Sequence, residues 1–394
     1  MNGLTLADLC ELVVDCKNRT PPEAARGERT VGFAIGTPHI INGRIRLSEA
    51  KPVSQETFDI WTARAIPRAG DIILTREAPV GRVGRIEEGM KICLGQRTML
   101  LRPGMQRSDS RFLHYFLLSP AIQDLLHAQA SGSTVAHLRV AQVRDLKLPS
   151  VPGVDEQRRI GAVLGALDDK IAVNERIAET AENLALALAS GERWDVRVRL
   201  GDLCVLRKEQ ISPREIPDGL VDHYSLPAFD AGKLPERENP ASIKSGKFLI
   251  EEPAVLLSKL NPDIPRVWNV LPESETRSLA STEFLVLVPR GKLSTHELWA
   301  VTAQQTFLND LASKVTGTSK SHQRVRPAEV LEAKLVDPRQ FGETGAQLRG
   351  LASRAALARR ESRTLGAIRD TLLPQLMSGR LRVKDAEKIV EDHT

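Results

Sequence analysis

The sequence has little of several features that mark common functional classes. Aromatic residues make up only 4% of its 394 residues, which argues against an extended platform for stacking nucleic-acid bases. Its four cysteines form no C-x-x-C pair, so the usual zinc and redox motifs are missing. The opening stretch MNGLTLADLCELVVDC carries acidic groups where a secretory signal needs basic ones. No apolar run approaches the ~18 residues of a membrane span. We therefore expect a cytoplasmic protein that enters no membrane.

Motifs for catalysis are missing as well. An amino-methyltransferase would need a glycine-rich cofactor loop and an Asn/Asp-Pro-Pro-aromatic motif. The nearest stretch, Asn261-Pro262-Asp263, lacks the second proline and the aromatic residue. No G-x-x-x-x-G-K-[ST] stretch indicates a nucleotide-driven motor. We expect no catalytic residue, no metal site and no cofactor. The net charge of +5 and the pI of about 9.1 are compatible with a polyanionic partner.

What the sequence does contain is an internal repeat. Residues 131–140 read SGSTVAHLRV and residues 316–325 read TGTSKSHQRV, with glycine, histidine, arginine and valine in register. Further echoes occur in the same order along both halves. They pair residues 6–10 with 200–204, 42–45 with 231–234, 71–83 with 254–267, and 190–191 with 378–379. Matches in one order indicate a two-fold internal duplication, whose period is too long for a solenoid.

Each copy is expected to be a mixed domain followed by a long helix. Short runs of Val, Ile and Leu, punctuated by Pro and Gly, end in helical stretches such as 110–130, which is typical of an α+β domain. The first long helix has Asp155 as its predicted N-cap and ends at Ser190-Gly191. Its apolar residues recur at 3-4 spacing with one polar seam position, Asn174, as in a coiled coil.

The second copy repeats this plan. Its helix spans about 344–378 and contains Pro374, which we expect to kink or fray the last turn. If a two-fold relates the copies, the helices run antiparallel and the end of the second, near Leu381, lies close to Leu6. The alternative is a plain helical hairpin core. The predicted fold is α+β: two similar α/β domains joined by two long antiparallel helices that form a coiled-coil spacer with an internal pseudo-two-fold. The predicted boundaries are 1–152 for the first domain, 153–195 for the first helix, 196–338 for the second domain, 339–385 for the second helix and 386–394 for a C-terminal tail.

Four stretches carry a resemblance to a known family. The helix region LKLPSVPGVDEQRRIGAVLGALDDKIAVNERIAETAENLALAL (146–188) closely resembles that of the specificity subunit of type I restriction–modification systems. DIILTREAPVGRVG (71–84), LLSKLNPDIPRVW (256–268) and the ending IRDTLLPQLMSGRLRV (368–383) are similar to further motifs of that family. The resemblance implies a non-catalytic subunit with two target recognition domains, each reading one half of a split DNA sequence. It also implies that the helices dock methyltransferase subunits and that the assembly recruits restriction–translocation subunits.

The repeated loop is the main candidate for contact with double-stranded DNA. Its small hydroxyl residues and glycine allow backbone N–H groups to approach a phosphate, and the arginines that follow could supply charge or a bidentate base contact. The alternative is that the loop only turns the chain and that its arginines pair with carboxylates. The candidates are Ser131, Gly132, Ser133, Thr134, His137 and Arg139, with Arg76 and Arg82, in the first copy, and Thr316, Gly317, Thr318, Ser319, Lys320, His322 and Arg324, with Lys259, in the second.

The first long helix is the candidate surface for a protein partner. We predict that it binds methyltransferase through an exposed face that consists of Arg158, Arg159, Asp168, Asp169, Lys170, Asn174 and Arg176. The alternative is a helix hairpin with an ordinary solvated face. Two other functions remain open at this point. One is the same subunit serving a stand-alone methyltransferase without restriction, and the other is a coiled-coil scaffold whose domains bind protein rather than DNA.

Overall fold

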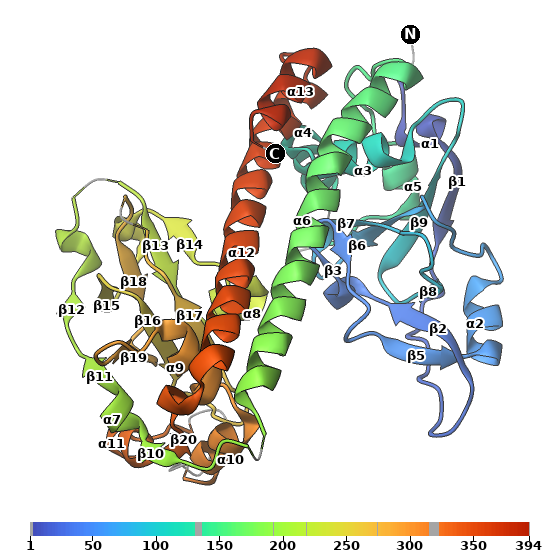
Figure 1. The fold of residues 1–394 in the computed structure, drawn as a ribbon. Coiled ribbons are helices and arrows are strands. Elements are labelled where there is room, and N and C mark those ends of the chain that lie inside the picture. Colours follow the sequence, from blue (N-terminus) through green and yellow to red (C-terminus); the bar gives the residue numbers. More distant parts are fainter. Residues whose placement is uncertain are drawn as a thin grey trace. The chain divides into compact units, whose positions relative to one another are not determined.

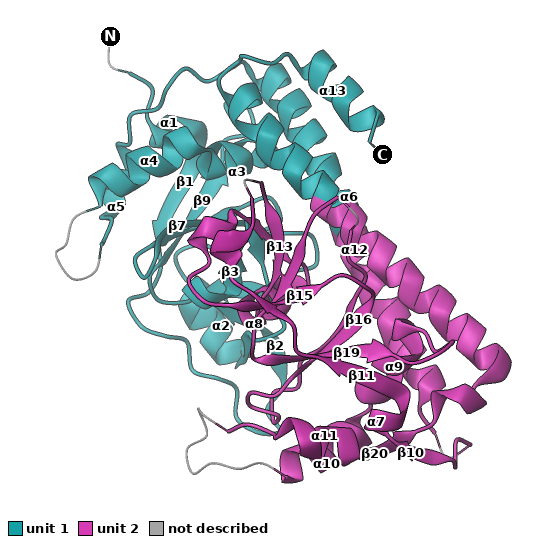
Figure 2. Cartoon of the chain, turned by 90° about the vertical axis from the view of Figure 1, so that its left-hand side faces the viewer, with its two compact units in different colours: residues 1–171, 364–394 teal, residues 172–363 magenta. Residues whose placement is uncertain are grey.

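The computed structural model describes residues 3–130, 136–191, 193–217, 219–273, 275–314 and 323–393. It divides into two compact units, which Figure 2 colours separately. The first unit contains residues 1–171 and 364–394, and the second contains residues 172–363. Each unit contains one mixed α/β domain together with a part of each long helix.

The first unit is built on a four-stranded antiparallel sheet in the order β1-β9-β6-β7. Its strands are β1 (Cys10–Asp15), β6 (Ile72–Arg76), β7 (Val80–Arg85) and β9 (Thr98–Pro103). The first four residues of β6 are all buried, which explains why the sequence shows a continuous apolar run there instead of an alternation. Two helices, α3 (Ser110–Leu118) and α4 (Pro120–Gln129), pack on β7 and bury Phe112 and Phe116.

A smaller sheet in the order β5-β2-β8 lies beside the first one in the same unit. A short hairpin, β3–β4, covers β7 in the same unit, and Gly84 of β7 makes this approach possible. A Cβ atom at Gly84 would stand 2.7 Å from Ile45 Cγ1 and 3.3 Å from Ile40 Cγ2. The additional elements of this unit are α1 (Leu6–Leu9), β2 (Thr30–Ile35), η1 (Thr37–His39), β3 (Ile40–Ile41), β4 (Arg44–Ile45), β5 (Lys51–Ser54), α2 (Gln55–Thr62), β8 (Ile92–Leu94) and α5 (Val140–Arg144).

The second unit repeats this topology, which confirms the predicted duplication. Its inner sheet has the order β11-β19-β16-β17, and the strand trio β14-β13-β18 reproduces β5-β2-β8, including one parallel pair. Two strands, β15 and β12, extend this outer sheet. The inner strands are β11 (Cys204–Arg207), β16 (Ala254–Ser258), β17 (Val267–Val270) and β19 (Phe284–Pro289). The others are β10 (Arg197–Arg199), α7 (Leu200–Leu203), β12 (Gln210–Ile211), η2 (Pro213–Glu215), β13 (Val221–Tyr224), α8 (Leu226–Gly232), β14 (Glu236–Glu238), η3 (Pro240–Ser242), β15 (Lys247–Ile250), β18 (Ser278–Ala280), α9 (Thr295–Thr302), α10 (Gln305–Ser313), α11 (Pro327–Glu332), β20 (Lys334–Val336) and η4 (Pro338–Gln340).

Two helices of 36 residues each, α6 (Val154–Ala189) and α12 (Gly342–Met377), are the longest elements (Figure 1). In the second unit, four alanines from the two helices form one buried cluster. They are Ala178 and Ala181 of α6 and Ala355 and Ala358 of α12. Further along α6, Ala185 and Ala189 share a cluster with residues that come earlier in α12. The helices therefore run antiparallel, and the small side chains allow close approach. The predicted helical spacer is confirmed.

The C-terminal end packs into the first unit. One apolar cluster contains Leu6, Leu376 and Val383, which confirms that the chain returns to the region where it began. Pro374 lies inside α12, and the helix continues past it to its end at Met377. Most of the predicted C-terminal tail, 386–394, is helical, because Val383–Glu391 form α13. None of the helices in the described ranges is both long enough and apolar enough to cross a bilayer.

Candidate nucleic-acid interface

In the first unit, the strand-turn signature lies against the residues that follow the repeated loop. Glu77 and His137 form an isolated β-bridge, and the N–H of Leu138 donates to the carbonyl of Arg76 at 2.9 Å. His137 is partly exposed, with Nδ1 3.9 Å from Glu77 Oε2. The candidates Ser131, Gly132, Ser133 and Thr134 lie outside the described residues.

The three candidate arginines of this unit differ in what they contact. The Arg76 side chain is only 11% exposed and forms a 2.9 Å ion pair with Asp15, so it connects β6 to β1. The guanidinium of Arg82 donates to the carbonyl of Thr37 at 3.0 Å. Arg139 is exposed immediately before α5, and its guanidinium forms no ion pair within the described ranges. Arg139 is therefore the candidate arginine of this unit that is most available to a ligand.

The second unit has the same arrangement but a different charge balance. Leu260 and Arg324 form the equivalent β-bridge, and the N–H of Val325 donates to the carbonyl of Lys259 at 3.0 Å. The Arg324 guanidinium donates to both carboxylate oxygens of Glu283, at 3.1 and 2.9 Å. These hydrogen bonds lower the pKa of Glu283. Arg324 therefore pairs with a carboxylate, as the alternative to DNA contact predicts for these arginines. The candidates Thr316, Gly317, Thr318, Ser319, Lys320 and His322 lie outside the described residues.

Six of the seven residues predicted to contact a protein partner are at least partly exposed on α6. Two of them form ion pairs within one turn of the helix, Arg158 with Asp155 at 2.8 Å and Arg159 with Glu156. Asp169 is 66% exposed and pairs with Arg111 of α3 at 3.0 Å. Lys170 is partly exposed and Arg176 is exposed. Their role in binding a partner stays a prediction.

Two of the seven require a correction: Asn174 is not exposed, and the carboxylate of the partly exposed Asp168 is occupied by contacts within the chain. Asn174 is completely buried, and its side-chain nitrogen and oxygen have no hydrogen-bond partner among the described residues. Asp168 is 19% exposed and is surrounded by donors. Its carboxylate accepts a 2.6 Å hydrogen bond from the Tyr115 hydroxyl and pairs with Arg369 of α12 at 2.6 Å. Burial raises the pKa of Asp168, but Arg369 and the other donors outweigh this effect and hold that pKa below its usual value.

Both units contain the same type of three-residue polar contact between the domain and the two long helices. In the first, Arg44 of β4 donates to the backbone carbonyl of Asp168 at 2.9 Å, next to the ion pair with Arg369. In the second, Lys233 lies 2.8 Å from Glu182 of α6, which also pairs with Arg359 of α12. A basic residue of each domain therefore meets a carboxylate of α6 and an arginine of α12. The two basic residues of this contact, Arg44 and Lys233, lie at equivalent places of the repeated segments 42–45 and 231–234.

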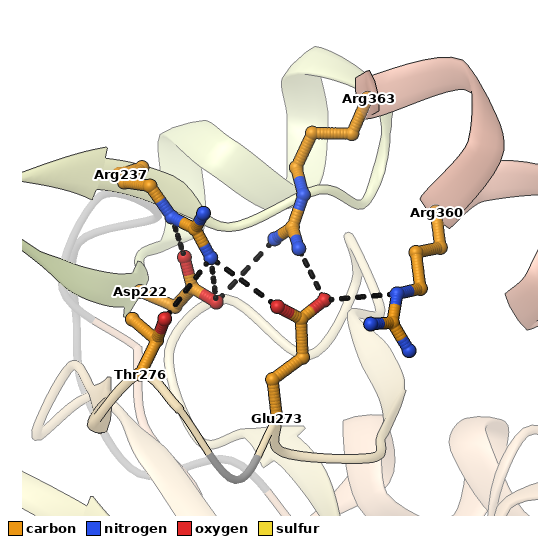
Figure 3. Close-up of polar contacts among 6 residues, drawn as sticks. All are labelled: Asp222, Arg237, Glu273, Thr276, Arg360 and Arg363. Carbon is orange, nitrogen blue, oxygen red and sulfur yellow. Dashed lines mark hydrogen bonds and ion pairs between the residues drawn. The ribbon is translucent and has the colours of Figure 1, made fainter. Parts of the chain in front are cut away.

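A second polar cluster in the second unit was not predicted (Figure 3). It contains Asp222 of β13, Arg237 of β14 and Glu273 from the segment after β17, together with Arg360 and Arg363 of α12. Asp222 is 1% exposed and pairs with Arg237 at 3.0 Å and with Arg363 at 3.3 Å. These partners come from segments up to 141 positions apart, so no local pattern reveals the cluster.

One grouping in the described ranges has the residue types of a metal site. His223, Glu236 and Glu238 place ligand-type atoms within 4.8 Å of one another. However, His223 Nδ1 and Glu238 Oε1 already share a 2.7 Å hydrogen bond, and the Ser242 hydroxyl donates to the other oxygen of Glu238. His223 and Glu238 are thus hydrogen-bonded to each other within this grouping.

Comparison with known proteins supports the class of protein indicated by this fold. Residues 4–183 match the family described as the type I restriction modification DNA specificity domain. The chain is 22% identical over 367 residues to the type I restriction enzyme MjaIX specificity subunit of Methanocaldococcus jannaschii, with 84% of this chain and 82% of that protein covered. It is 25% identical over 121 residues to the EcoBI specificity subunit of Escherichia coli, with 31% of this chain and 25% of that protein covered.

A solved structure shows the same fold. The crystal structure of the S subunit of the type I restriction–modification system from M. genitalium has a TM-score of 0.54 and 15% identity, and the match covers 95% of each chain. This match shows that the two proteins share the fold, with duplicated α/β domains and two long helices. The resemblance drawn from the sequence is confirmed: the chain is similar to a type I specificity subunit over most of its length, and residues 4–183 match the DNA specificity domain of that family.

Proposed function

We propose that each recognition domain reads one half of a bipartite double-stranded DNA target. The observation that carries this proposal is the duplicated domain with non-identical charge at equivalent positions. Arg139 is exposed without an ion pair in the described ranges, whereas Arg324, its counterpart, is held by Glu283. Equivalent scaffolds with different faces suit two different half-sites, since phosphate contacts position a protein and base contacts specify the sequence.

The helices are proposed to dock methyltransferase subunits, and restriction–translocation subunits would join the assembly. The exposed charged residues Arg158, Arg159, Asp169 and Arg176 of α6 support a polar docking surface. In this proposal the chain has no catalytic activity and binds no cofactor of its own. Its partners carry out methylation and cleavage, and the complex works in the cytoplasm. The four free cysteines are all buried, which is compatible with a reducing compartment.

Methylome sequencing of the source cell, and of a strain that lacks this gene, tests the proposal. The expected result is a split motif with a fixed gap that disappears with the gene. Exchange of residues 1–152 for those of another recognition domain should then change one half of the motif and leave the other intact. A scaffold that binds only protein would leave the methylome unchanged, and the purified chain would show no salt-dependent binding to DNA. A motif methylated without any cleavage activity would indicate a stand-alone methyltransferase.

A further inference from the structure

In the described part of the second unit, the apolar clusters of the outer sheet include no residue of α12. These two clusters contain residues of the domain, such as Tyr224 and Leu279, but none of α6 or α12. A cavity of about 610 Å³ lies between β17 with its following segment and α12. The exposed residues Leu271 and Leu357 contribute to the lining from either side. The apolar clusters therefore do not join this part of the domain to the helix, whereas ion pairs do.

The polar cluster of Figure 3 supplies these ion pairs. From the domain, Asp222 lies on β13, Arg237 on the neighbouring strand β14, and Glu273 just after β17. From α12, Arg363 pairs with Asp222 at 3.3 Å and also with Glu273, and Arg360 pairs with Glu273 at 3.3 Å. We call these five residues the polar latch.

The composition of the polar latch favours a positioning role. Three guanidinium groups surround two carboxylates, so Arg363 can bridge both acids while Arg237 satisfies them from the domain side. Arginine holds carboxylates in a fixed, planar geometry, unlike the adaptable packing of an apolar contact. Asp222 is buried, and loss of Arg363 would leave it with Arg237 as its one remaining ion-pair partner in the described part of the chain.

We propose that Arg363 and Arg360 are positioning residues that fix the outer sheet of the second recognition domain on α12, and that the polar latch thereby determines specificity for one half-site. This inference rests on the proposed function, because it assigns the second domain to one half of a bipartite target. A binding constellation must be held within about 0.5 Å and 10–20° of its productive geometry, so a loosened sheet should accept more sequences.

Hydrogen exchange of the full chain tests the attachment itself. In Arg363→Gln, exchange in β13 and β14 should accelerate at least about tenfold, while β16 in the inner sheet keeps its protection. Arg354→Gln is the matched control, since Arg354 is exposed on the same helix and forms no ion pair in the described ranges. Unchanged exchange in β13 and β14 would overturn the proposal. Faster exchange in all three strands would indicate a general loss of stability and would also count against a local role of the polar latch. Arg363→Lys, which keeps the charge but not the planar fork, should accelerate exchange in β13 and β14 less than Arg363→Gln does.

The specificity claim is tested in the complex with the methyltransferase partner. Arg363→Gln should relax the half-motif that survives exchange of residues 1–152, with the other half unchanged and with Arg354→Gln like the wild type. Equal relaxation of both halves, or a strict motif despite faster exchange, would overturn the claim. If the wild-type chain directs no methylation, the proposed function fails together with this claim. The exchange data would still decide whether the polar latch holds the sheet.

Discussion

Replacement of Asp168 by asparagine removes a largely buried charge while it keeps the size of the side chain. In the folded protein this carboxylate accepts from the Tyr115 hydroxyl at 2.6 Å, pairs with Arg369 at 2.6 Å and has Arg44 Nη2 at 3.5 Å. Asparagine can still accept one hydrogen bond, but its NH2 group faces donors. The guanidinium of Arg369 would then lie half-satisfied beside Asp370. Because these groups belong to the first unit, the change should loosen that unit at the junction of α3, β4 and both helices.

The expected loss follows from the burial of the pair. Removal of one partner of a buried ion pair costs about 3–5 kcal/mol. Since Arg369 keeps Asp370 as a second partner, we expect the lower end of this range, about 3 kcal/mol. For a unit of this size each kcal/mol shifts the melting temperature by about 2–4 °C. The melting transition of the first unit should therefore fall by about 6–12 °C.

Scanning calorimetry of Asp168→Asn beside Asp169→Asn measures this effect with a neighbouring control. Asp169 is 66% exposed and has one pair, with Arg111, so its loss should cost less than about 1 kcal/mol. Because the pKa of Asp168 is lowered in the folded state, its stabilisation is complete above the unfolded pKa of ~3.9 and is lost as the pH falls through the folded value. The difference between variant and wild type should therefore shrink below about pH 4. Equal destabilisation by both variants would refute the argument from burial.

Three further predictions concern separate sites. Burial lowers the pKa of His114 to about 4, so the unfolded chain binds a proton that the folded chain does not, and the unfolding free energy should fall as the pH drops from ~6.5 towards 4; His114→Leu should flatten this dependence in urea titrations. Gly84→Ala should cost about 1–3 kcal/mol through its clash with the β3–β4 hairpin, whereas Gly366→Ala, with open space around it inside α12, should stabilise by about 1 kcal/mol in the same titrations. Arg139→Gln should make the fall of log affinity for DNA with log salt concentration shallower by about 0.9. Arg324→Gln should change this slope less, because Glu283 already neutralises Arg324.

The sequence predicts most of the architecture because the duplication leaves its trace in local patterns. The repeated decapeptide, the strand-turn signature and the Ser-Gly pairs all lie at equivalent places of the two domains or helices. The local signals, which are the caps and the 3-4 spacing, locate the ends of α6 and α12 within about two residues, although Asp155 lies in the first turn of α6 and is not its N-cap. The wider helix boundaries, 153–195 and 339–385, extend past the ends of both helices. Even the return of the chain end to Leu6 follows from the order of the repeated segments.

The ion clusters could not be predicted in the same way. Asp168 lies beside the seam residue Leu167, and on a helical projection it reads as the edge of a solvated face. It becomes buried because Arg44 and Tyr115, from two other elements, meet it in space. Burial of a charge depends on partners that are distant in sequence, so a helix pattern alone assigns Asp168 and Asp169 to the same class. The structure separates them by their exposed fractions, 19% and 66%.

The polar seam position of α6 shows how far the repeat can extend such reasoning. The two long helices begin at residues 154 and 342, an offset of 188, and the same offset relates Ser190-Gly191 to Ser378-Gly379. Applied to Asn174, this offset gives Ser362. Both side chains are buried in the second unit, and neither has a hydrogen-bond partner among the described residues. A buried polar group in a helix seam costs stability and is best attested as a device that fixes helix register. The duplication therefore carries polarity at one seam position in both copies, where apolar residues would pack more tightly.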